Sequence, residues 1–418
     1  MHQSHRIQED QARANVAIAS EIGDVAATSV WLARLEGLMA GSSSSLSEQG
    51  GDALGSLNTR PLLPRHIFVC VHGIYGKPSD SDHIAAALTR TFGESAKVLQ
   101  SAANTHKTHL GVRLMGTNLA IEVLDMLHSH QTHPGKDVPT NERRGDGTRL
   151  SFIGHSLGGI VARYAIVYLQ AALIAYGIQP TSFTTLCTPH LGSRRPGGSL
   201  GKELWKSAVH SLMSVSFIYG QTGMELLCQD HNDTPLLELM SKPDSVFMAA
   251  LKAFDHRTAV AMLQGDYIVP RASAAIQPHM PTLPRPSNHP GWQWSVAYSG
   301  FADELDTTTG STSPTSSSSF PPPLDASSRW MADDRDQVAI SLDILTGLNT
   351  VMWRRVHVHV TYAGPCLWHW LSFHTWPLGI QVPTTSKSRQ FIFHVLGRML
   401  AQDHHHQHHT MMMMRTTL

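Results

Sequence analysis

The sequence contains few cysteines and no excess of charge of either sign. Four of its 418 residues are cysteine, widely spaced and without a CxxC pair, so neither a disulfide framework nor a structural zinc site is indicated. The 32 Lys and Arg residues balance the 32 Asp and Glu residues, which gives a formal net charge of zero. Because no basic stripe is available to neutralise phosphates, no nucleic-acid partner is expected.

Export and membrane insertion are not indicated either. The N-terminal stretch, MHQSHRIQEDQARANVAIAS, has no basic segment followed by an apolar one, as a secretory leader would. No apolar run is expected to reach the roughly 18 to 20 residues of a membrane-spanning helix. The hydrophobic fraction of 41% suffices for a large core, with Cys70 and Cys187 as buried free thiols. The sequence therefore predicts a soluble, cytoplasmic protein.

Three segments depart from the pattern of an ordered domain. Residues 1–64 combine a helical stretch with a Ser- and Gly-rich linker, which predicts a poorly ordered N-terminal extension. Residues 277–336 are rich in Pro and Ser, which predicts a flexible insertion. Residues 403–418 form a low-complexity His and Met tail, where no functional metal site is expected. The ordered domain is therefore predicted to span residues 65–402.

Within this domain, short apolar runs alternate with stretches of helical spacing. The runs Ile67 to Val71 and Leu150 to Ile153 are typical of strands buried on both faces, and a helical pattern follows each of them. A later run, Val356 to Val360, alternates like a further strand. This order predicts an α/β fold with a mostly parallel central sheet and helices on both of its faces.

One serine lies between glycines where a strand gives way to a helix, in the stretch RLSFIGHSLGGIVAR. The pentapeptide is Gly154-His155-Ser156-Leu157-Gly158, the arrangement of a nucleophile elbow. Glycines at both ends permit a turn too tight for side chains. The turn raises the Ser156 hydroxyl at the start of a helix, where backbone N–H groups favour a developing anion. Ser156 is therefore predicted to be a catalytic nucleophile.

A nucleophilic serine requires an acid, a base and donors for the oxyanion. Asp266 follows the strand-like run TAVAMLQG and is the predicted acid. The oxyanion donors are predicted to be the N–H groups of Leu157, which follows the serine, and Ile74. Gly73, in VHGIYG, allows the backbone to turn so that Ile74 faces the nucleophile. The neighbouring His72 is interpreted as a structural residue rather than a base.

Five blocks in order resemble one family: HIFVCVHGIYGKPSD, LMGTNLAIEV, LSFIGHSLGGIVARYAI, FTTLCTPHLGSR and GDYIVPRASA. They are similar to the lipase-like serine esterases of the α/β-hydrolase superfamily, some of which are lipid-droplet phospholipases or lipases. The resemblance covers about residues 65–276 and resumes at MWRRVHVHV. It implies an α/β-hydrolase fold, Ser156 as nucleophile and Asp266 as acid. It also implies that the loop TPHLG borders the site, where His190 is interpreted as shaping the loop.

The general base is less clearly marked, because the Ala-His-Asn segment that the family carries after the WRRVxV strand is absent here. His374 is the predicted base, since it lies in a loop beyond that strand and before the last helix, and His369 is the alternative. His357 and His359 share one face of the strand and are interpreted as packing or surface residues, with a metal-binding pair as the alternative. His394 falls within the last helix and is interpreted as structural.

Together these features predict a serine hydrolase that cleaves carboxylic esters, with lipids as the substrates that the resemblance implies. No metal or organic cofactor is expected. Contact with a membrane or lipid-droplet surface would come from an apolar lid or patch rather than from a spanning helix. Two alternatives stay open: an acyl-protein thioesterase or other acyl hydrolase, and a non-catalytic α/β-hydrolase scaffold that binds lipid or protein.

Overall fold

The computed structural model describes residues 2–44, 63–129, 147–193, 216–231, 233–266, 268–278, 293–300, 330–332, 339–361, 373–379 and 385–404. Their centre is a seven-stranded sheet of order β2-β1-β3-β4-β5-β9-β6. Its strands are β1 (His66–Val71), β2 (Ala96–Gln100), β3 (Arg149–His155), β4 (Gln179–Leu186), β5 (His256–Met262), β6 (Gln293–Gly300) and β9 (Arg354–Thr361). Every neighbouring pair is parallel except β6 with β9. The predicted α/β fold is confirmed.

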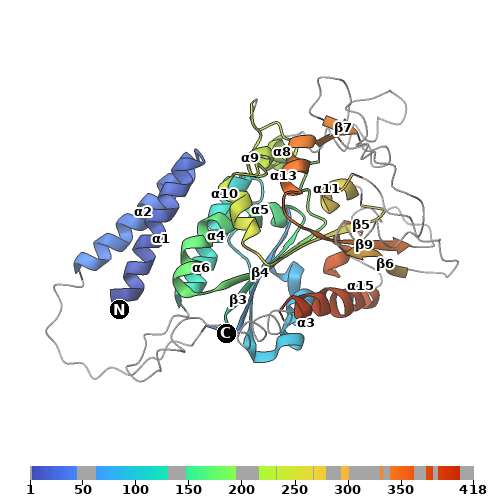
Figure 1. Ribbon diagram of the computed structural model, residues 1–418, viewed down its shortest axis with the longest axis horizontal. Coiled ribbons are helices and arrows are strands. Elements are labelled where there is room, and N and C mark those ends of the chain that lie inside the picture. The colour runs from blue at the N-terminus through green and yellow to red at the C-terminus, as the bar shows by residue number, and fades with distance from the viewer. Residues whose placement is uncertain are drawn as a thin grey trace, which may run out of the picture.

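Helices cover both faces of this sheet (Figure 1). The helices among the described residues are α1 (His2–Glu21), α2 (Val25–Ser44), α3 (Asp82–Phe92), α4 (Val112–Ser129), α5 (Leu157–Ala165), α6 (Gln170–Tyr176), α8 (Ser216–Leu226), α9 (Leu236–Leu239), α10 (Val246–Lys252), α11 (Arg271–Ala275), α13 (Leu342–Leu348) and α15 (Thr385–Phe391). Short 3-10 turns are η1 (Pro78–Ser81), η2 (Gly93–Ser95), η3 (Ile166–Leu169) and η5 (Trp376–Leu378), and a π-helical turn, η6 (Ile392–Leu396), continues α15. A separate two-stranded sheet pairs β7 (Trp330–Ala332) antiparallel with β8 (Ala339–Ser341).

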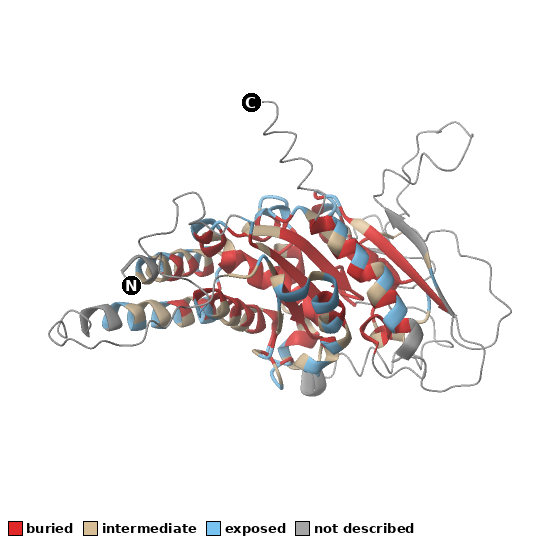
Figure 2. Cartoon of the chain, turned by 90° about the horizontal axis from the view of Figure 1, so that it is seen from below, coloured by how far each residue is buried: buried red, intermediate tan, exposed pale blue. Residues whose placement is uncertain are grey.

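The apolar strands are buried because alternate residues face two different helical layers. In β1, Ile67 and Val69 belong to the large core under α4 and α5, whereas Phe68 and Cys70 belong to a second core under α3 and α15. A residue on either face of such a strand is therefore enclosed, which explains the continuous apolar run in the sequence. Figure 2 shows the buried sheet between its helical layers.

The N-terminal extension departs from expectation. Residues 2–44 form two helices, α1 and α2, which pack against each other and lie beside α4 and α6 (Figure 1). Trp31 of α2 is fully buried, with its ring centroid 5.4 Å from that of Tyr168. Asp24, between the helices, accepts a hydrogen bond from the Tyr164 hydroxyl. Residues 2–44 are thus helical, which differs from the expectation for this part of the extension, because the large ring of Trp31 gives the helix pair an anchor in the core.

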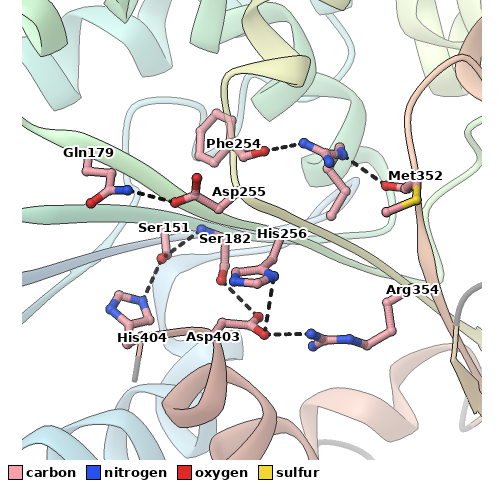
Figure 3. A network of polar contacts seen from close by, with 11 residues as sticks. Ser151, Gln179, Ser182, Phe254, Asp255, His256, Met352, Arg354, Asp403 and His404 are labelled. Carbon is pink, nitrogen blue, oxygen red and sulfur yellow. Dashed lines mark hydrogen bonds and ion pairs between the residues drawn. The ribbon is translucent and has the colours of Figure 1, made fainter. Parts of the chain in front are cut away.

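Two other segment boundaries also shift. The predicted insertion at 277–336 contains β6, which extends the main sheet by pairing with β9; residues 279–292 and 301–329 lie outside the described part. The first two residues of the predicted tail, Asp403 and His404, belong to the domain, since both are 1% exposed. Figure 3 shows them against the sheet: Asp403 accepts hydrogen bonds from Ser182 and Arg354, and His404 contacts Ser151.

One helical run is longer and more apolar than expected. Leu157–Tyr176, which comprises α5, η3 and α6, has the length and hydropathy of a membrane span. The expectation that no apolar run reaches that length is therefore wrong. In the fold, 83% of its most apolar window is buried, under α4 and the N-terminal helices. The run accordingly has the environment of a core helix, where apolar side chains on all sides are required.

Candidate active site

Ser156 stands at the turn between β3 and α5, as the elbow pattern predicts. Its backbone has φ 53° and ψ −127°, a conformation that side-chain-bearing residues rarely adopt and that costs about 1 to 3 kcal/mol. The turn is held by hydrogen bonds from the Ser156 N–H to Leu186 O at 2.8 Å and from the Gly159 N–H to Ser156 O at 3.1 Å. Core packing on both sides offsets the strain and fixes the hydroxyl above the end of the sheet.

The glycines around the serine are required by close backbone approach. A Cβ at Gly154 would lie 2.5 Å from the Cα of Gly159, and one at Gly158 would lie 2.2 Å from the carbonyl oxygen of Val71. Gly73 in the loop after β1 is also crowded, since its Cβ would lie 2.9 Å from the Cβ of Ser156. The loop after β1 and the start of α5 are therefore packed directly against the serine.

Three side chains predicted from the sequence meet at this point. His374 Nε2 lies 2.9 Å from Ser156 Oγ, and His374 Nδ1 lies 2.8 Å from Asp266 Oδ2. The carboxylate can only accept, so Nδ1 carries the proton and Nε2 is free to accept the serine proton. Both the serine and the histidine are 4% exposed, so their contacts form away from bulk water. The alternative base, His369, lies outside the described residues.

The acid is oriented by backbone donors of its own turn. Asp266 Oδ1 accepts hydrogen bonds of 3.0 Å from the N–H groups of Ile268 and Val269, which leaves Oδ2 for the histidine. Asp266 follows β5, and His374 belongs to the described segment 373–379 beyond β9, the neighbouring strand. The carboxyl ends of adjacent parallel strands thus bring together residues 108 positions apart.

The predicted oxyanion donors lie on the two segments that flank the serine. Leu157 is the first residue of α5, where the N–H has no partner within the helix. Ile74 follows Gly73, whose contact with Ser156 brings the loop after β1 to the nucleophile. This loop is tied down by a hydrogen bond from the Tyr75 N–H to Thr108 Oγ1 at 3.0 Å. The oxyanion role of these two N–H groups stays a prediction.

Sequence reasoning missed a contact of His155, the residue before the serine. Its Nε2 lies 2.9 Å from the carbonyl oxygen of His374, and the two rings are 4.9 Å apart. Because a carbonyl only accepts, His155 is the Nε2–H tautomer and donates this bond. Burial, and then the neighbouring His374, lower the pKa of His155 to about 3. His155 is thus a neutral clasp between the elbow and the segment that carries the base.

A second residue at this site that the sequence analysis did not assign is Cys187, the first residue after β4. It is fully buried, and its sulfur belongs to a group with Asp266 and His374 in which one ligand atom of each lies within 4.8 Å of the others. Burial raises the pKa of the Cys187 thiol well above its usual value, and the charge of Asp266 raises it further. At neutral pH this group is therefore a protonated thiol beside the acid.

The other candidate histidines have packing or structural contacts. His190 Nε2 lies 2.9 Å from Thr185 Oγ1, and its ring packs against Trp353. His357 is buried and lies 3.2 Å from Gln277 Oε1, while His394 is an exposed residue of η6. Neither His357 nor His359 belongs to a three-residue group of metal-ligand type among the described residues. His72 Nδ1 donates to the carbonyl oxygen of Gly73 at 2.9 Å.

The strand order, the serine elbow after β3, the acid after β5 and the histidine beyond β9 define an α/β-hydrolase. The chain belongs to the family described as "Putative serine esterase (DUF676)", which matches residues 63–277. The domain thus belongs to a serine esterase family, in agreement with the resemblance of its five sequence blocks.

Similar proteins carry related names. The chain is 30% identical over 224 residues to "Putative lipase C4A8.10" of Schizosaccharomyces pombe, a match that covers 51% of this chain and 26% of that protein. It is 27% identical to "Putative lipase ROG1" of Saccharomyces cerevisiae, over 52% of this chain and 29% of that protein. The matched region thus spans less than a third of the length of these two curated relatives.

Solved structures of hydrolases are more distant. The thioesterase RedJ of the prodiginine biosynthetic pathway of Streptomyces coelicolor is 16% identical, with a TM-score of 0.25 over 52% of this chain and 78% of that chain. An extracellular α/β-hydrolase of a Paenibacillus species is 19% identical, with a TM-score of 0.22 over 38% and 53%. The assignment of the fold rests on the order and direction of the strands in this chain.

Proposed function

We propose that this chain hydrolyses carboxylic esters of lipids through an acyl-enzyme on Ser156. The observation that carries the proposal is the continuous hydrogen-bonded series from Ser156 Oγ through His374 to Asp266, with contacts of 2.9 and 2.8 Å. The elbow conformation of the serine and the family membership support it independently. We further propose a cytoplasmic location with peripheral contact to membrane or lipid-droplet surfaces, in line with an ester of a lipid as substrate.

In this mechanism, Ser156 Oγ attacks the acyl carbonyl while His374 Nε2 accepts the hydroxyl proton. Asp266 keeps the proton on Nδ1 and stabilises the imidazolium that forms. The N–H groups of Leu157 and Ile74 receive the oxyanion, a type of contact whose loss typically costs about 10² to 10³ in rate. His374 then protonates the leaving alcohol. A water molecule, deprotonated by the same nitrogen, releases the acid and restores the serine.

The lipid part of the proposal rests on the lipase names of the curated relatives and on the family. A panel of esters, thioesters and amides with short and long acyl chains tests it directly. Preference for long-chain esters supports the proposal. Preference for thioesters would favour an acyl-protein thioesterase, and preference for short, soluble esters would contradict a lipid substrate.

Labelling with a fluorophosphonate probe, followed by mass spectrometry of the adduct, tests the nucleophile and its base. We expect an adduct on Ser156 and none in Ser156→Ala. We expect His374→Ala to slow labelling on the order of 10⁶-fold, the size of effect seen when a triad base is removed. His369→Ala is the matched control and is expected to label like the wild type.

The opposite results have definite meanings. Fast labelling of His374→Ala together with slow labelling of His369→Ala would move the base to His369. Failure of the folded wild-type protein to label, with detergent present to expose the site, would contradict the enzyme and favour a non-catalytic α/β-hydrolase scaffold.

A further inference from the structure

Cys187, Asp266 and His374 bring three different metal-ligand types into one buried cluster. One ligand atom from each lies within 4.8 Å of the other two. The cysteine follows β4 and the aspartate follows β5, which are neighbouring parallel strands, and the Cys187 N–H donates to Val260 O of β5 at 2.9 Å. The ester-hydrolysis mechanism uses the aspartate and the histidine but gives no role to the thiol.

The chemistry of this set fits a cation that prefers sulfur and nitrogen. Zn²⁺ binds thiolate, imidazole and carboxylate, and its tetrahedral geometry separates ligand atoms by about 3.3 to 3.8 Å. The contact of 2.8 Å between His374 and Asp266 would have to widen by less than about 1 Å to admit the ion. The two backbone N–H groups that hold Asp266 Oδ1 already orient the carboxylate, as the outer shell of a metal site does.

Charge balance favours occupation of this buried position. A thiolate and a carboxylate together carry two negative charges, which cancel the two positive charges of the ion. The neutral complex avoids the large cost of an unpaired buried charge. Mg²⁺ and Ca²⁺ prefer oxygen ligands and are not suited to a site with sulfur and nitrogen.

We propose that Cys187, Asp266 and His374 form an inhibitory site for a thiophilic divalent cation such as Zn²⁺. On binding, the Cys187 thiol releases its proton to solvent, and the proton of His374 moves from Nδ1 to Nε2 as the metal takes Nδ1. Net, one proton leaves for each ion bound, and no oxidation occurs. The Nε2–H cannot accept a proton from Ser156, so the nucleophile is not activated. The inhibitory consequence rests on the proposed esterase function, whereas metal binding does not.

Direct binding is tested with Co²⁺, which reports thiolate coordination by a charge-transfer band in the near-ultraviolet. We expect the purified full chain to show this band and to lose it on addition of excess Zn²⁺. Cys187→Ala and the conservative Cys187→Ser are both expected to lack it. Cys228→Ser and Cys366→Ser are controls that are expected to keep it, since Cys228 is a buried thiol outside the cluster.

Inhibition is tested on ester hydrolysis, with each variant compared with its own rate in the presence of chelator. Zn²⁺ and Cd²⁺ should inhibit the wild type reversibly, while Mg²⁺ and Ca²⁺ should not. Cys187→Ala should need at least about 100-fold more Zn²⁺ for the same inhibition, because loss of a supporting outer-shell group alone costs 10- to 100-fold in affinity.

The outcomes separate the two proposals. A thiolate band without any esterase activity would keep the metal site and contradict the esterase. Esterase activity in a protein without the band, or with a band that Cys366→Ser abolishes, would overturn the metal site alone. Undiminished sensitivity to Zn²⁺ in Cys187→Ala would also overturn it, since the ion would then act elsewhere.

Discussion

The position of His374, the proposed base, depends on His155, the residue that precedes the proposed nucleophile. His374 lies in the described segment 373–379, between residues that the structure leaves undescribed, and its backbone carbonyl is bonded to His155. His155 is 6% exposed, and its ring packs on the ring of His374. The elbow therefore carries both Ser156 and the hydrogen-bond donor, His155, that helps to set the distance from Ser156 to His374.

We expect His155→Ala to lower kcat about 10- to 100-fold with little change in KM. Removing the donor leaves a buried carbonyl without a partner, at a cost of about 1 to 3 kcal/mol, and a small shift of the base is costly to catalysis. His155→Gln, which retains an N–H donor, should recover part of the rate. His394→Ala, at an exposed position, is the control. Equal kcat in His155→Ala and wild type would contradict the role of the clasp.

The sequence predicts the serine and the acid because each belongs to a local pattern: Ser156 to a glycine-bounded elbow, and Asp266 to the end of an apolar strand. His374 required a choice among several histidines, since its partners lie more than a hundred positions away. Cys187 was not predictable as a neighbour of the acid. It looks like any thiol at the end of an apolar run, and only the pairing of β4 with β5 brings it to Asp266.

Among the elements, α2 shows how one side chain decides whether a helix is anchored. The helical spacing of residues 25–40 was visible in the sequence, but its attachment was not, because Trp31 pairs with Tyr168 from a distant part of the chain. We expect Trp31→Ala to lower the free energy of unfolding by about 3 to 5 kcal/mol, as for other buried aromatic residues. Urea denaturation measures this loss.

Leu32→Ala is the matched control, since Leu32 is the next residue of α2 and is 41% exposed. We expect Leu32→Ala to lower the free energy of unfolding by less than about 1 kcal/mol. Equal losses for the two variants would mean that α2 is not anchored through its tryptophan.

Helix α8 is attached to the start of α4 through a carboxyl group. Glu225 Oε2 accepts a hydrogen bond from the Val112 N–H at 2.6 Å, and Thr222 Oγ1 accepts one from the Gly111 N–H at 3.0 Å. Burial raises the pKa of Glu225 to about 7, against the opposing effect of the Val112 N–H. Glu225 is 2% exposed, so the protonation state of its carboxyl group affects the stability of this contact.

The direction of the pH dependence follows from the pKa values of Glu225 in the unfolded and the folded chain. Between its unfolded value of 4.5 and about 7, the folded chain keeps this proton while the unfolded chain has released it. Raising the pH through this whole range therefore lowers the free energy of unfolding by about 3 kcal/mol. We expect Glu225→Gln, which keeps an acceptor for Val112, to be more stable than the wild type at pH 8 and similar to it near pH 4.5.

Melting temperatures of both proteins across this range provide the measurement, with Asp244→Asn, at an exposed position, as the control. A constant difference between wild type and Glu225→Gln at all pH values would exclude the carboxyl group as the source of the pH dependence.

In the whole molecule, the candidate active site and the polar network around Asp403 and His404 lie at opposite ends of the sheet. Ser156, Cys187 and Asp266 follow the carboxyl ends of their strands. The network in Figure 3 lies at the other end, where Asp403 accepts hydrogen bonds from Ser182 at 3.0 Å and Arg354 at 2.7 Å. His404 links Ser151 of β3 to His66 of β1, with contacts of 3.0 and 2.7 Å.

This network was hidden in the sequence because its last member belongs to a run of histidines. The composition of HHHQHH suggests a tail, and nothing local distinguishes His404 from the residues after it. The buried serines on the strands, Ser151 and Ser182, were the available signal: fully buried hydroxyl groups need partners. Those partners come from the end of the last helix, which therefore joins strands β1, β3, β4 and β9.

A truncation series places the end of the domain. We expect a chain that ends at His404 to match the full chain in stability, and a chain that ends at Gln402 to lose about 3 to 5 kcal/mol, the cost of breaking a buried charge pair. Because the network is remote from Ser156, the rate of ester hydrolysis or of fluorophosphonate labelling below the melting transition should be the same in both. Denaturation midpoints and rates, measured on the same samples, test the two halves of this prediction. Equal midpoints would contradict closure by Asp403 and His404, and a slower reaction in the folded shorter chain would mean that the two ends of the sheet are coupled.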